Sequence, residues 1–171
     1  MSIAAGSARA ILDAVSIHEL KEKGAQITFL DKNPQANEYS KNLIKDRHYG
    51  ENYKFSWIVD TANNFSKYFE QKKQPNIIEI VGLLDYFNRE EIKRLFHSVF
   101  LNLEKGGVFI TSNIVDNPER KFITNVVGWN MLYKTPDDFY EIAREVGFKD
   151  EDMEFIYEPM KIHFVMVAHK P

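Results

Sequence analysis

The sequence has no cysteine among its 171 residues. This absence excludes disulfide bonds, a thiol nucleophile and thiolate ligands for a metal ion, because all three require the cysteine sulfur. A chain without cysteine suits a reducing compartment, and we expect it in the cytoplasm.

Histidine is scarce as well: the five are His18, His48, His97, His163 and His169. No two of them stand at the spacing of four that is typical of a helical metal site, so we expect no metal. His97 falls on a predicted helix, away from the strand ends where a ligand would bind. No histidine is therefore a strong candidate for a general base.

A large excess of charge of one sign is also lacking, because 22 basic and 25 acidic residues give a net charge of −3. This balance offers no reason to expect nucleic acid as a partner. No apolar run approaches the roughly 18 residues that a membrane helix needs, and the start lacks signal-peptide features. We expect one globular domain over residues 1–171, with no membrane span.

Small residues follow the first apolar residues, in Ile3-Ala4-Ala5-Gly6-Ser7-Ala8. Such a segment is typical of a strand, a tight turn and a helix start, whose free N–H groups favour a polar or anionic ligand group. One glycine is fewer than the three of the G-x-G-x-x-G dinucleotide motif. The turn alone fits an ordinary strand-to-helix connection equally well.

The next predicted strand, residues 27–30, is followed by Asp31. An acidic residue at this place can accept hydrogen bonds from the two ribose hydroxyls of a nucleoside. Gly6 and Asp31 are 25 residues apart, near the roughly 20 expected of a nucleoside-binding βαβ unit. We therefore interpret the pair as the centre of a nucleoside-cofactor site. The alternative for Asp31 is a carboxylate that caps the following helix.

Hydrophobic periodicity and turn residues predict alternating strands and helices along the chain. The predicted strands cover residues 27–30, 55–60, 76–82, 108–112, 153–159 and 162–169. The predicted helical segments cover residues 8–23 (ended by Gly24), 34–47, 65–70, 88–103, part of 119–133, and 135–146. Asn88 with Glu91 predicts a capping box, and Thr135 followed by Pro136 predicts a helix start.

Alternation of this kind indicates a mostly parallel sheet with helices on both faces. The last two predicted strands follow each other directly and form an antiparallel hairpin. Ligands of such sheets bind at the carboxyl ends of the strands. Five polar or glycine residues fall at those ends: Gly6, Asp31, Asp60, Gly82 and Asn113.

These segments resemble the class I S-adenosylmethionine-dependent methyltransferases over nearly the whole chain. Residues 4–9 take the place of the acidic, glycine-rich first turn of that family, and Phe29–Pro34 match its acid after the second strand. Further matches are residues 60–63, 82–87 and 104–110, and Gly147-Phe148 before the hairpin. The resemblance implies an α/β, Rossmann-like doubly wound, mostly parallel sheet with a C-terminal antiparallel β-hairpin.

The resemblance also implies S-adenosyl-L-methionine as the cofactor, and it assigns roles by position. The implied cofactor contacts are Ala4, Ala5, Gly6 and Ser7 for the amino-acid end, Asp31 and Lys32 for the ribose, Asp60 and Thr61 for the adenine, and Gly82 and Leu83 for the sulfonium side. The implied acceptor-side residues are Asp85 and Tyr86 as catalytic and Asn113, Trp129 and Tyr133 as substrate-binding. Turn formation, capping and core packing are the alternative roles for these residues.

The fourth strand lacks the Asn/Asp-Pro-Pro-Tyr/Phe pattern with which enzymes of this kind hold a planar nitrogen. A nucleobase or glutamine nitrogen is therefore disfavoured, and oxygen, carbon and amine acceptors of small molecules stay open. We expect a small-molecule acceptor, with oxygen favoured over a nucleobase nitrogen. More narrowly, residues 82–87, 112–113 and 129–133 are similar to a group of bacterial methyltransferases, some linked to methyl esters of hydroxy fatty acids.

The start of the chain departs from the family pattern. Few residues precede the turn, whereas a buried parallel strand has about five, so we expect a truncated first strand. The N-terminal segment that covers the cofactor in the family has no counterpart, and a missing domain or a homodimer would supply it. The alternatives are a catalytically inactive methyltransferase-like domain or fragment, and an NAD-dependent oxidoreductase, whose sheet would continue in parallel instead of ending in a hairpin.

Overall fold

The structure is a computed structural model that describes residues 1–16, 23–47, 49, 51–69 and 73–171. The chain divides into two compact units, residues 1–68 and residues 69–171. Several sequence-based predictions lie outside the described residues: the later part of the helix expected over residues 8–23, the positions His18 and His48, and Glu70 at the end of the segment 65–70.

The first unit contains three parallel strands in the order β3-β2-β1. They are β1 (Ser2–Ile3), β2 (Ala25–Asp31) and β3 (Tyr53–Val59). Ile3 lies opposite Leu30, and Asp31 lies opposite Val59. The expected short first strand is confirmed, because β1 has 2 residues. This register brings the turn after β1 and the residues after β2 and β3 to one edge of the unit.

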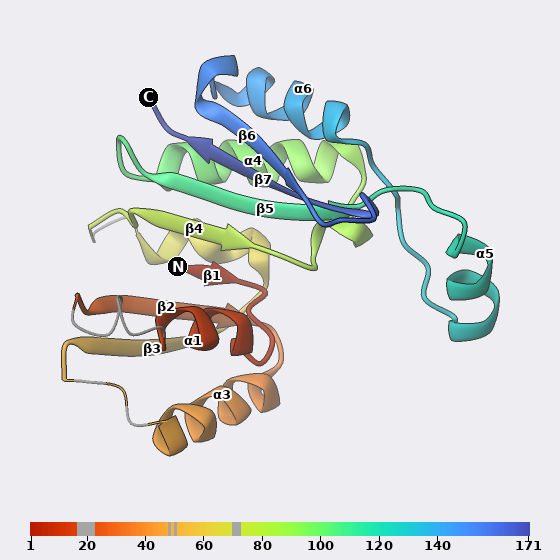
Figure 1. The fold of residues 1–171 in the computed structure, drawn as a ribbon. Coiled ribbons are helices and arrows are strands. Elements are labelled where there is room, and N and C mark those ends of the chain that lie inside the picture. The colour runs from red at the N-terminus through yellow and green to blue at the C-terminus, as the bar shows by residue number, and fades with distance from the viewer. Residues whose placement is uncertain (17–22, 48, 50, 70–72) are drawn as a thin grey trace. The chain divides into compact units, whose positions relative to one another are not determined.

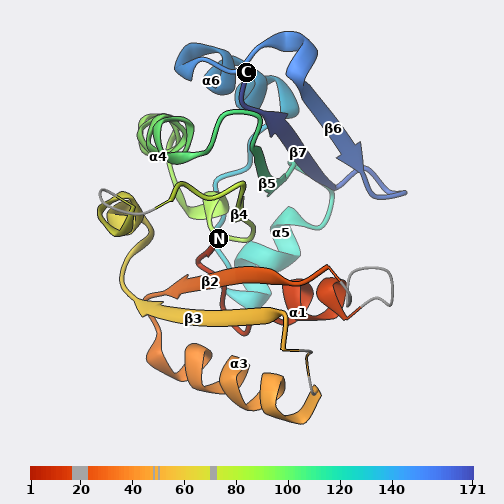
Figure 2. The same ribbon diagram turned by 90° about the vertical axis from the view of Figure 1, so that its left-hand side faces the viewer.

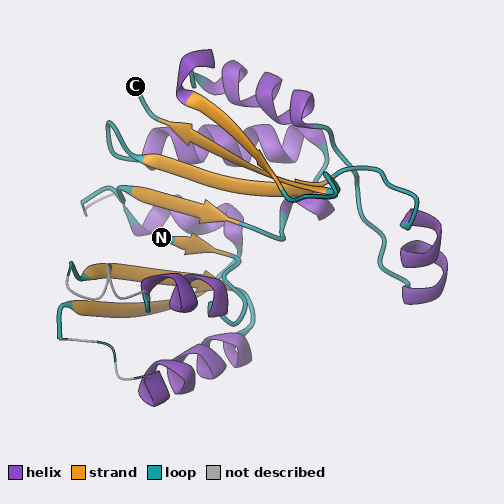
Figure 3. Ribbon diagram, viewed as in Figure 1, coloured by secondary structure: helices purple, strands orange, loops and turns teal. Residues whose placement is uncertain are grey.

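Helices α1 (Arg9–Val15) and α3 (Pro34–Arg47) pack on one face of these strands (Figure 3). Side chains from both helices and from alternate positions of β2 and β3 form the core: Leu12, Leu43, Ile27, Phe29, Phe55 and Trp57. The rings of Phe29 and Phe55 stack with centroids 6.2 Å apart. The predicted helix over residues 34–47 is confirmed.

The helical stretch predicted over residues 65–70 was placed too late in the chain. A 3-10 helix, η1 (Ala62–Tyr68), begins soon after β3. Its first turn starts directly after Asp60, whose carboxylate accepts hydrogen bonds from the backbone of Thr61 and from Asn64. These hydrogen bonds stabilise a tight helical turn soon after the strand ends.

The second unit contains four strands in the order β4-β5-β7-β6 (Figure 1). They are β4 (Ile77–Ile80), β5 (Val108–Ile114), β6 (Met153–Tyr157) and β7 (His163–His169). β4 and β5 are parallel, whereas β7 pairs antiparallel with both β5 and β6. The predicted C-terminal hairpin is therefore confirmed.

Helices α4 (Arg89–Asn102) and α6 (Pro136–Val146) lie on the same side of this sheet (Figure 2). Their contact with the strands is aromatic. Phe96 of α4 packs edge to face against Phe109 of β5 and Phe139 of α6, and Phe139 packs in the same way against Phe164 of β7. All four rings are fully buried, so they anchor both helices to the sheet.

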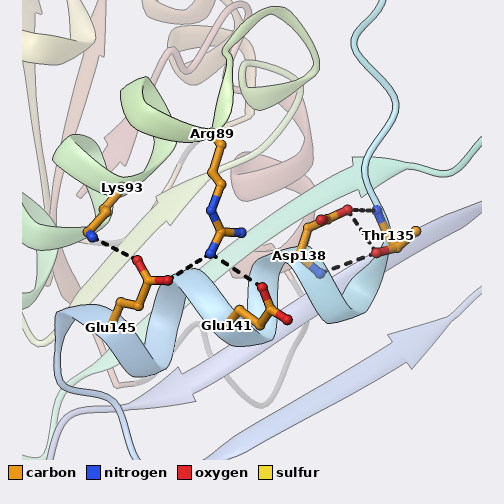
Figure 4. Close-up of polar contacts among 6 residues, drawn as sticks. All are labelled: Arg89, Lys93, Thr135, Asp138, Glu141 and Glu145. Atoms are coloured by element: carbon orange, nitrogen blue, oxygen red, sulfur yellow. Dashed lines mark hydrogen bonds and ion pairs between the residues drawn. The ribbon is translucent and has the colours of Figure 1, made fainter.

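Both predicted helix starts in this unit are confirmed as capping boxes, formed by Asn88 with Glu91 and by Thr135 with Asp138. Figure 4 shows the second box together with the ion pairs that join α4 to α6. Arg89 contacts Glu141 at 3.3 Å and Glu145 at 2.7 Å, and Lys93 contacts Glu145 at 2.7 Å. The two helices are thus joined at the surface as well as in the core.

The remaining helical turns of the second unit are short. They are η2 (Leu84–Tyr86), α5 (Arg120–Phe122), the π-helical turn η3 (Ile123–Val127) and η4 (Asp150–Asp152). α5 stands away from strands β4, β5, β7 and β6 (Figure 1). The expectation of partial helix in residues 119–133 is confirmed. Within the described residues, no helix combines the length and apolar character needed to cross a bilayer.

Candidate functional site

The turn after β1 has an unusual backbone. Ala4, Gly6 and Ala8 all have a φ between 52° and 55°, in the left-handed region that favours glycine. The turn therefore adopts a left-handed conformation at every second residue, although glycine occupies only one of the three positions. A side-chain carbon built on Gly6 would meet no atom within 4 Å, so the space above this turn is open.

Gly6 and Asp31, the pair on which the sequence interpretation centred, are in direct contact. The Gly6 N–H donates to Asp31 Oδ2 across 2.8 Å, and the Asn33 N–H donates to Asp31 Oδ1 across 2.8 Å. Helix α3 is capped separately, because Asn33 Oδ1 accepts from the Gln35 N–H. These bonds fix the Asp31 carboxylate between the turn and the start of α3.

Asp60 lies beside Asp31, since its N–H donates to the Asp31 carbonyl oxygen across 3.2 Å. The Asp60 carboxylate accepts from the Thr61 N–H and from Asn64 with one oxygen, and from Tyr68 and Lys67 with the other. These donors, Lys67 first, lower the pKa of Asp60 well below its usual range. Asp60 therefore shapes the loop after β3 and leaves the exposed side chains of Lys32 and Thr61 at the same edge.

The first unit thus offers the parts of a nucleoside site. An ionised carboxylate has about four lone-pair positions, and Asp31 uses two of them for Gly6 and Asn33. The other two can accept from a pair of adjacent hydroxyls. The open space above Gly6 permits a ligand to approach the backbone of residues 4–7. The residues present therefore fit a nucleoside cofactor.

In the second unit, the end of β4 leads into a second open turn. Gly82 is exposed with a φ of 76°, and a side-chain carbon built there would meet no atom within 4 Å. Leu83 follows and is half-buried. The next residues, Leu84 and Asp85, turn inward and are buried.

Asp85 holds three segments of this unit together. Its side chain is 5% exposed, and its Oδ1 accepts from the Ile114 N–H at the end of β5 across 3.2 Å. Its carbonyl oxygen accepts from the Leu132 N–H across 2.7 Å. The carboxylate is thus oriented by the backbone of its neighbours.

Lys134 completes the same network. Its N–H donates to Asn113 Oδ1 across 3.3 Å, and its Nζ donates to the carbonyl oxygens of Leu84 at 2.8 Å and Leu132 at 2.6 Å. Asn113 is fully buried, and its Nδ2 has no hydrogen-bond partner among the residues that the structure describes. The network therefore joins the carboxyl ends of β4 and β5 to the segment before α6.

The three predicted aromatic residues differ in exposure: Tyr86 and Trp129 are exposed and contact each other, whereas the hydroxyl of Tyr133 is buried. Trp129 Nε1 donates to the Tyr86 hydroxyl across 2.6 Å, and both side chains are nearly half exposed. Tyr133 stacks under the Arg120 guanidinium, and its hydroxyl is buried with no hydrogen-bond partner in the described part of the chain. Of the five predicted acceptor-side residues, Asn113 bonds to Lys134, Asp85 is linked to Lys134 through the backbone of Leu132, and Tyr86 and Trp129 contact each other.

Sequence reasoning missed Lys134. Burial lowers its pKa to about 8, against the opposing effect of Asp85, Asp138 and Glu91. A single lysine before a predicted helix gives no sequence signal of such an environment. In the part of the chain that the structure describes, no cluster of three or more histidine, aspartate or glutamate side chains is arranged to hold a metal.

No protein-family model matches the chain, and no curated protein matches it. Solved structures do match, each over 99% of the chain. A Bordetella parapertussis protein, described as a possible exported protein, has 16% identity and a TM-score of 0.78. The S-adenosylmethionine-dependent methyltransferase SibL has 16% identity and a TM-score of 0.71, and human N-acetylserotonin methyltransferase in complex with S-adenosylmethionine has 14% and 0.66.

This chain spans 60%, 49% and 46% of those three chains, respectively. At these identities the likeness is one of fold. The fold is the Rossmann-like, mostly parallel sheet with a C-terminal antiparallel hairpin that class I methyltransferases share, which confirms the fold expected from the sequence.

Proposed function

We propose that this chain is a methyltransferase domain that uses S-adenosyl-L-methionine to methylate a small molecule, with oxygen favoured over a nucleobase nitrogen as the acceptor atom. The observation that supports it most is the bond between the Gly6 N–H and the Asp31 carboxylate, at the strand ends where this fold binds ligands. Two structures of the same fold, SibL and the human enzyme, are S-adenosylmethionine-dependent or hold that compound.

In this proposal the first unit binds the nucleoside. The backbone of residues 4–7 contacts the amino-acid end, because the open turn permits close approach. Asp31, next to Lys32, accepts from the ribose hydroxyls with its two remaining lone pairs. The loop that Asp60 shapes presents Thr61 to the adenine.

In the second unit, we assign the transferred group and the acceptor to residues at the ends of β4 and β5 and to the segment before α6. The cofactor supplies a methyl group on a sulfonium, and the protein has mainly to align the acceptor and exclude water. Gly82 and Leu83 contact the sulfonium side, and Tyr86 contacts the acceptor together with Asn113, Trp129 and Tyr133. Asp85 is buried and bonded to the Ile114 N–H, so we assign it a positioning role.

Calorimetric titration with S-adenosylmethionine and with its demethylated product tests the proposal. We expect micromolar affinity for both ligands, because S-adenosylmethionine and its demethylated product have the same nucleoside and amino-acid ends. Replacement Asp31→Ala removes both ribose acceptors and should weaken binding at least tenfold. Glu38→Ala is the matched control, because Glu38 is an exposed acid of the same unit that pairs with Lys41 on the surface of α3.

NAD serves as the competing ligand in the same experiment. An oxidoreductase would bind NAD at least as tightly as S-adenosylmethionine. Equal affinity of the wild-type and Asp31→Ala proteins for S-adenosylmethionine would remove the role proposed for Asp31. Circular dichroism of both variants separates loss of binding from loss of fold.

A further inference from the structure

Lys134 is the unexpected feature of the second unit. Its Nζ lies between two carbonyl oxygens, those of Leu84 and Leu132, at 2.8 and 2.6 Å. Leu84 opens the turn that follows β4, so the amine lies at the strand end where the proposed acceptor binds. No function derived above uses it.

A hydrogen count shows that the amine can lose a proton without losing either bond. A lysine ammonium has three N–H donors, and two of them are directed to the two carbonyls. The neutral amine keeps two N–H groups, which satisfy the same carbonyls, and gains a lone pair. Deprotonation therefore costs no hydrogen bond.

The surroundings of Lys134 favour the neutral form of its amine more than an exposed surface position would. Burial lowers the pKa of Lys134 to about 8, because the charged form is poorly solvated there. The negative charges of three carboxylates raise the pKa and so oppose this effect: Asp85 of η2, Asp138 of α6 and Glu91 of α4. A substantial fraction of the amine is thus neutral in mildly basic solution.

The negative charges of the same three carboxylates favour an uncharged acceptor molecule. An anionic acceptor, such as a carboxylate, would approach the amine against three negative charges. An uncharged hydroxyl meets no such repulsion. Beside the network, Tyr86, Trp129 and Leu132 are 49%, 44% and 49% exposed, and they offer an apolar surface for the rest of the molecule.

We propose that Lys134 is the proton acceptor for an uncharged alcohol or phenol with an apolar body. This inference rests on the proposed function. The hydroxyl proton passes to the lone pair of Lys134 Nζ, which becomes an ammonium. The hydroxyl oxygen forms a bond to the methyl carbon while the carbon–sulfur bond breaks with its electron pair on sulfur. The products are a methyl ether and a neutral thioether.

The first test needs no cofactor or acceptor. Trace labelling of the whole protein with acetic anhydride at a series of pH values, read by mass spectrometry, reports the protonation of each lysine. We expect Lys134 to become reactive with a midpoint near pH 8. Lys93, whose pKa is raised by its ion pair with Glu145, is the internal control and should react only at higher pH. Parallel reactivity of the two lysines would overturn the proposal.

The second test uses matched acceptor pairs: naphthol against naphthoate, and octanol against octanoate. We expect transfer to the hydroxyl compounds, with kcat/KM rising about tenfold per pH unit up to about pH 8 and level above it. Lys134→Arg keeps the cation and can donate to both carbonyls but cannot accept a proton. It should lower kcat on the order of 100-fold with little change in KM and remove the pH dependence. Lys134→Met should lower kcat as much and also reduce the melting temperature.

Cofactor binding, measured on the same samples, separates the two proposals. Three outcomes would each refute the role of Lys134 alone. They are preferred methylation of the carboxylates, transfer to neither class of acceptor by a protein that binds S-adenosylmethionine, and a wild-type rate in Lys134→Arg. Absence of S-adenosylmethionine binding would refute the proposed function and, with it, the role of Lys134 in methyl transfer, and the labelling midpoint would then report only the protonation of the amine.

Discussion

The N–H of Gly6 donates to a carboxylate oxygen of Asp31 across 2.8 Å, and this bond joins two residues that are 25 positions apart in the sequence. It ties the turn after β1 to the end of β2. Because the Asn33 N–H donates to the other oxygen, the carboxylate keeps one orientation, and within the described residues half of its lone pairs stay free. This is the arrangement that a ligand with two adjacent hydroxyls requires.

Gly6→Ala should reduce cofactor affinity more than it reduces stability. Gly6 has a φ of 52°, so alanine at this position costs about 1 kcal/mol of folding free energy. The added methyl group enters the open space above the turn, where the cofactor is proposed to bind. Gly106→Ala is the matched control, because Gly106 has a φ of 73° and equally open surroundings. Urea denaturation should show similar losses for both variants, whereas calorimetry should show weaker binding only for Gly6→Ala. Equal binding by the two variants would contradict the proposed approach to the turn.

Asp60→Asn should destabilise the protein in a way that depends on pH. The folded pKa of Asp60 lies below its ordinary value of 3.8, so its contribution is fully present above that value and declines as the pH falls below it. The gap in unfolding free energy between the wild type and this variant should therefore be constant near neutrality and shrink in acid. Denaturation curves over this pH range measure it, with the exposed Glu151→Gln as control. A gap that does not change with pH would show that the charge of Asp60 is immaterial.

Thr135→Ala should lower the unfolding free energy by about 1 kcal/mol. Thr135 Oγ1 accepts from the Asp138 N–H and donates to the Asp138 carboxylate, which closes the capping box of α6. Thr135→Ser retains the hydroxyl and should stay within a few tenths of a kcal/mol of the wild type. Thermal and chemical denaturation report both values. Equal losses in the two variants would mean that the methyl group, not the cap, stabilises the helix start.

Local signals made much of the fold predictable. Asn88 with Glu91 and Thr135 with Pro136 mark helix starts because each cap is completed within one helical turn. The C-terminal hairpin was predictable because two strand patterns follow each other with a short link. The proximity of Gly6 and Asp31 was predictable because parallel strands bring their carboxyl ends to one edge.

Other features depend on contacts that a sequence pattern does not reveal. Ala4 and Ala8 adopt a left-handed backbone that alanine ordinarily avoids, so only the surrounding fold imposes it. Asp60 starts η1 early because four donors converge on its carboxylate. Lys134 Nζ donates a hydrogen bond to the carbonyl oxygen of Leu84, which is 50 residues away in the sequence. Such long-range contacts are set by the tertiary structure.

The most direct test of the central claim is a titration of the labelled protein with the demethylated product of S-adenosylmethionine, followed residue by residue in amide proton–nitrogen correlation spectra. The account predicts that the largest shifts fall on the amides of Gly6, Ser7, Asn33 and Thr61 and that Asp31→Ala abolishes them. A folded protein whose amide signals stay unchanged at millimolar ligand, or shift only in segments remote from these residues, would contradict it.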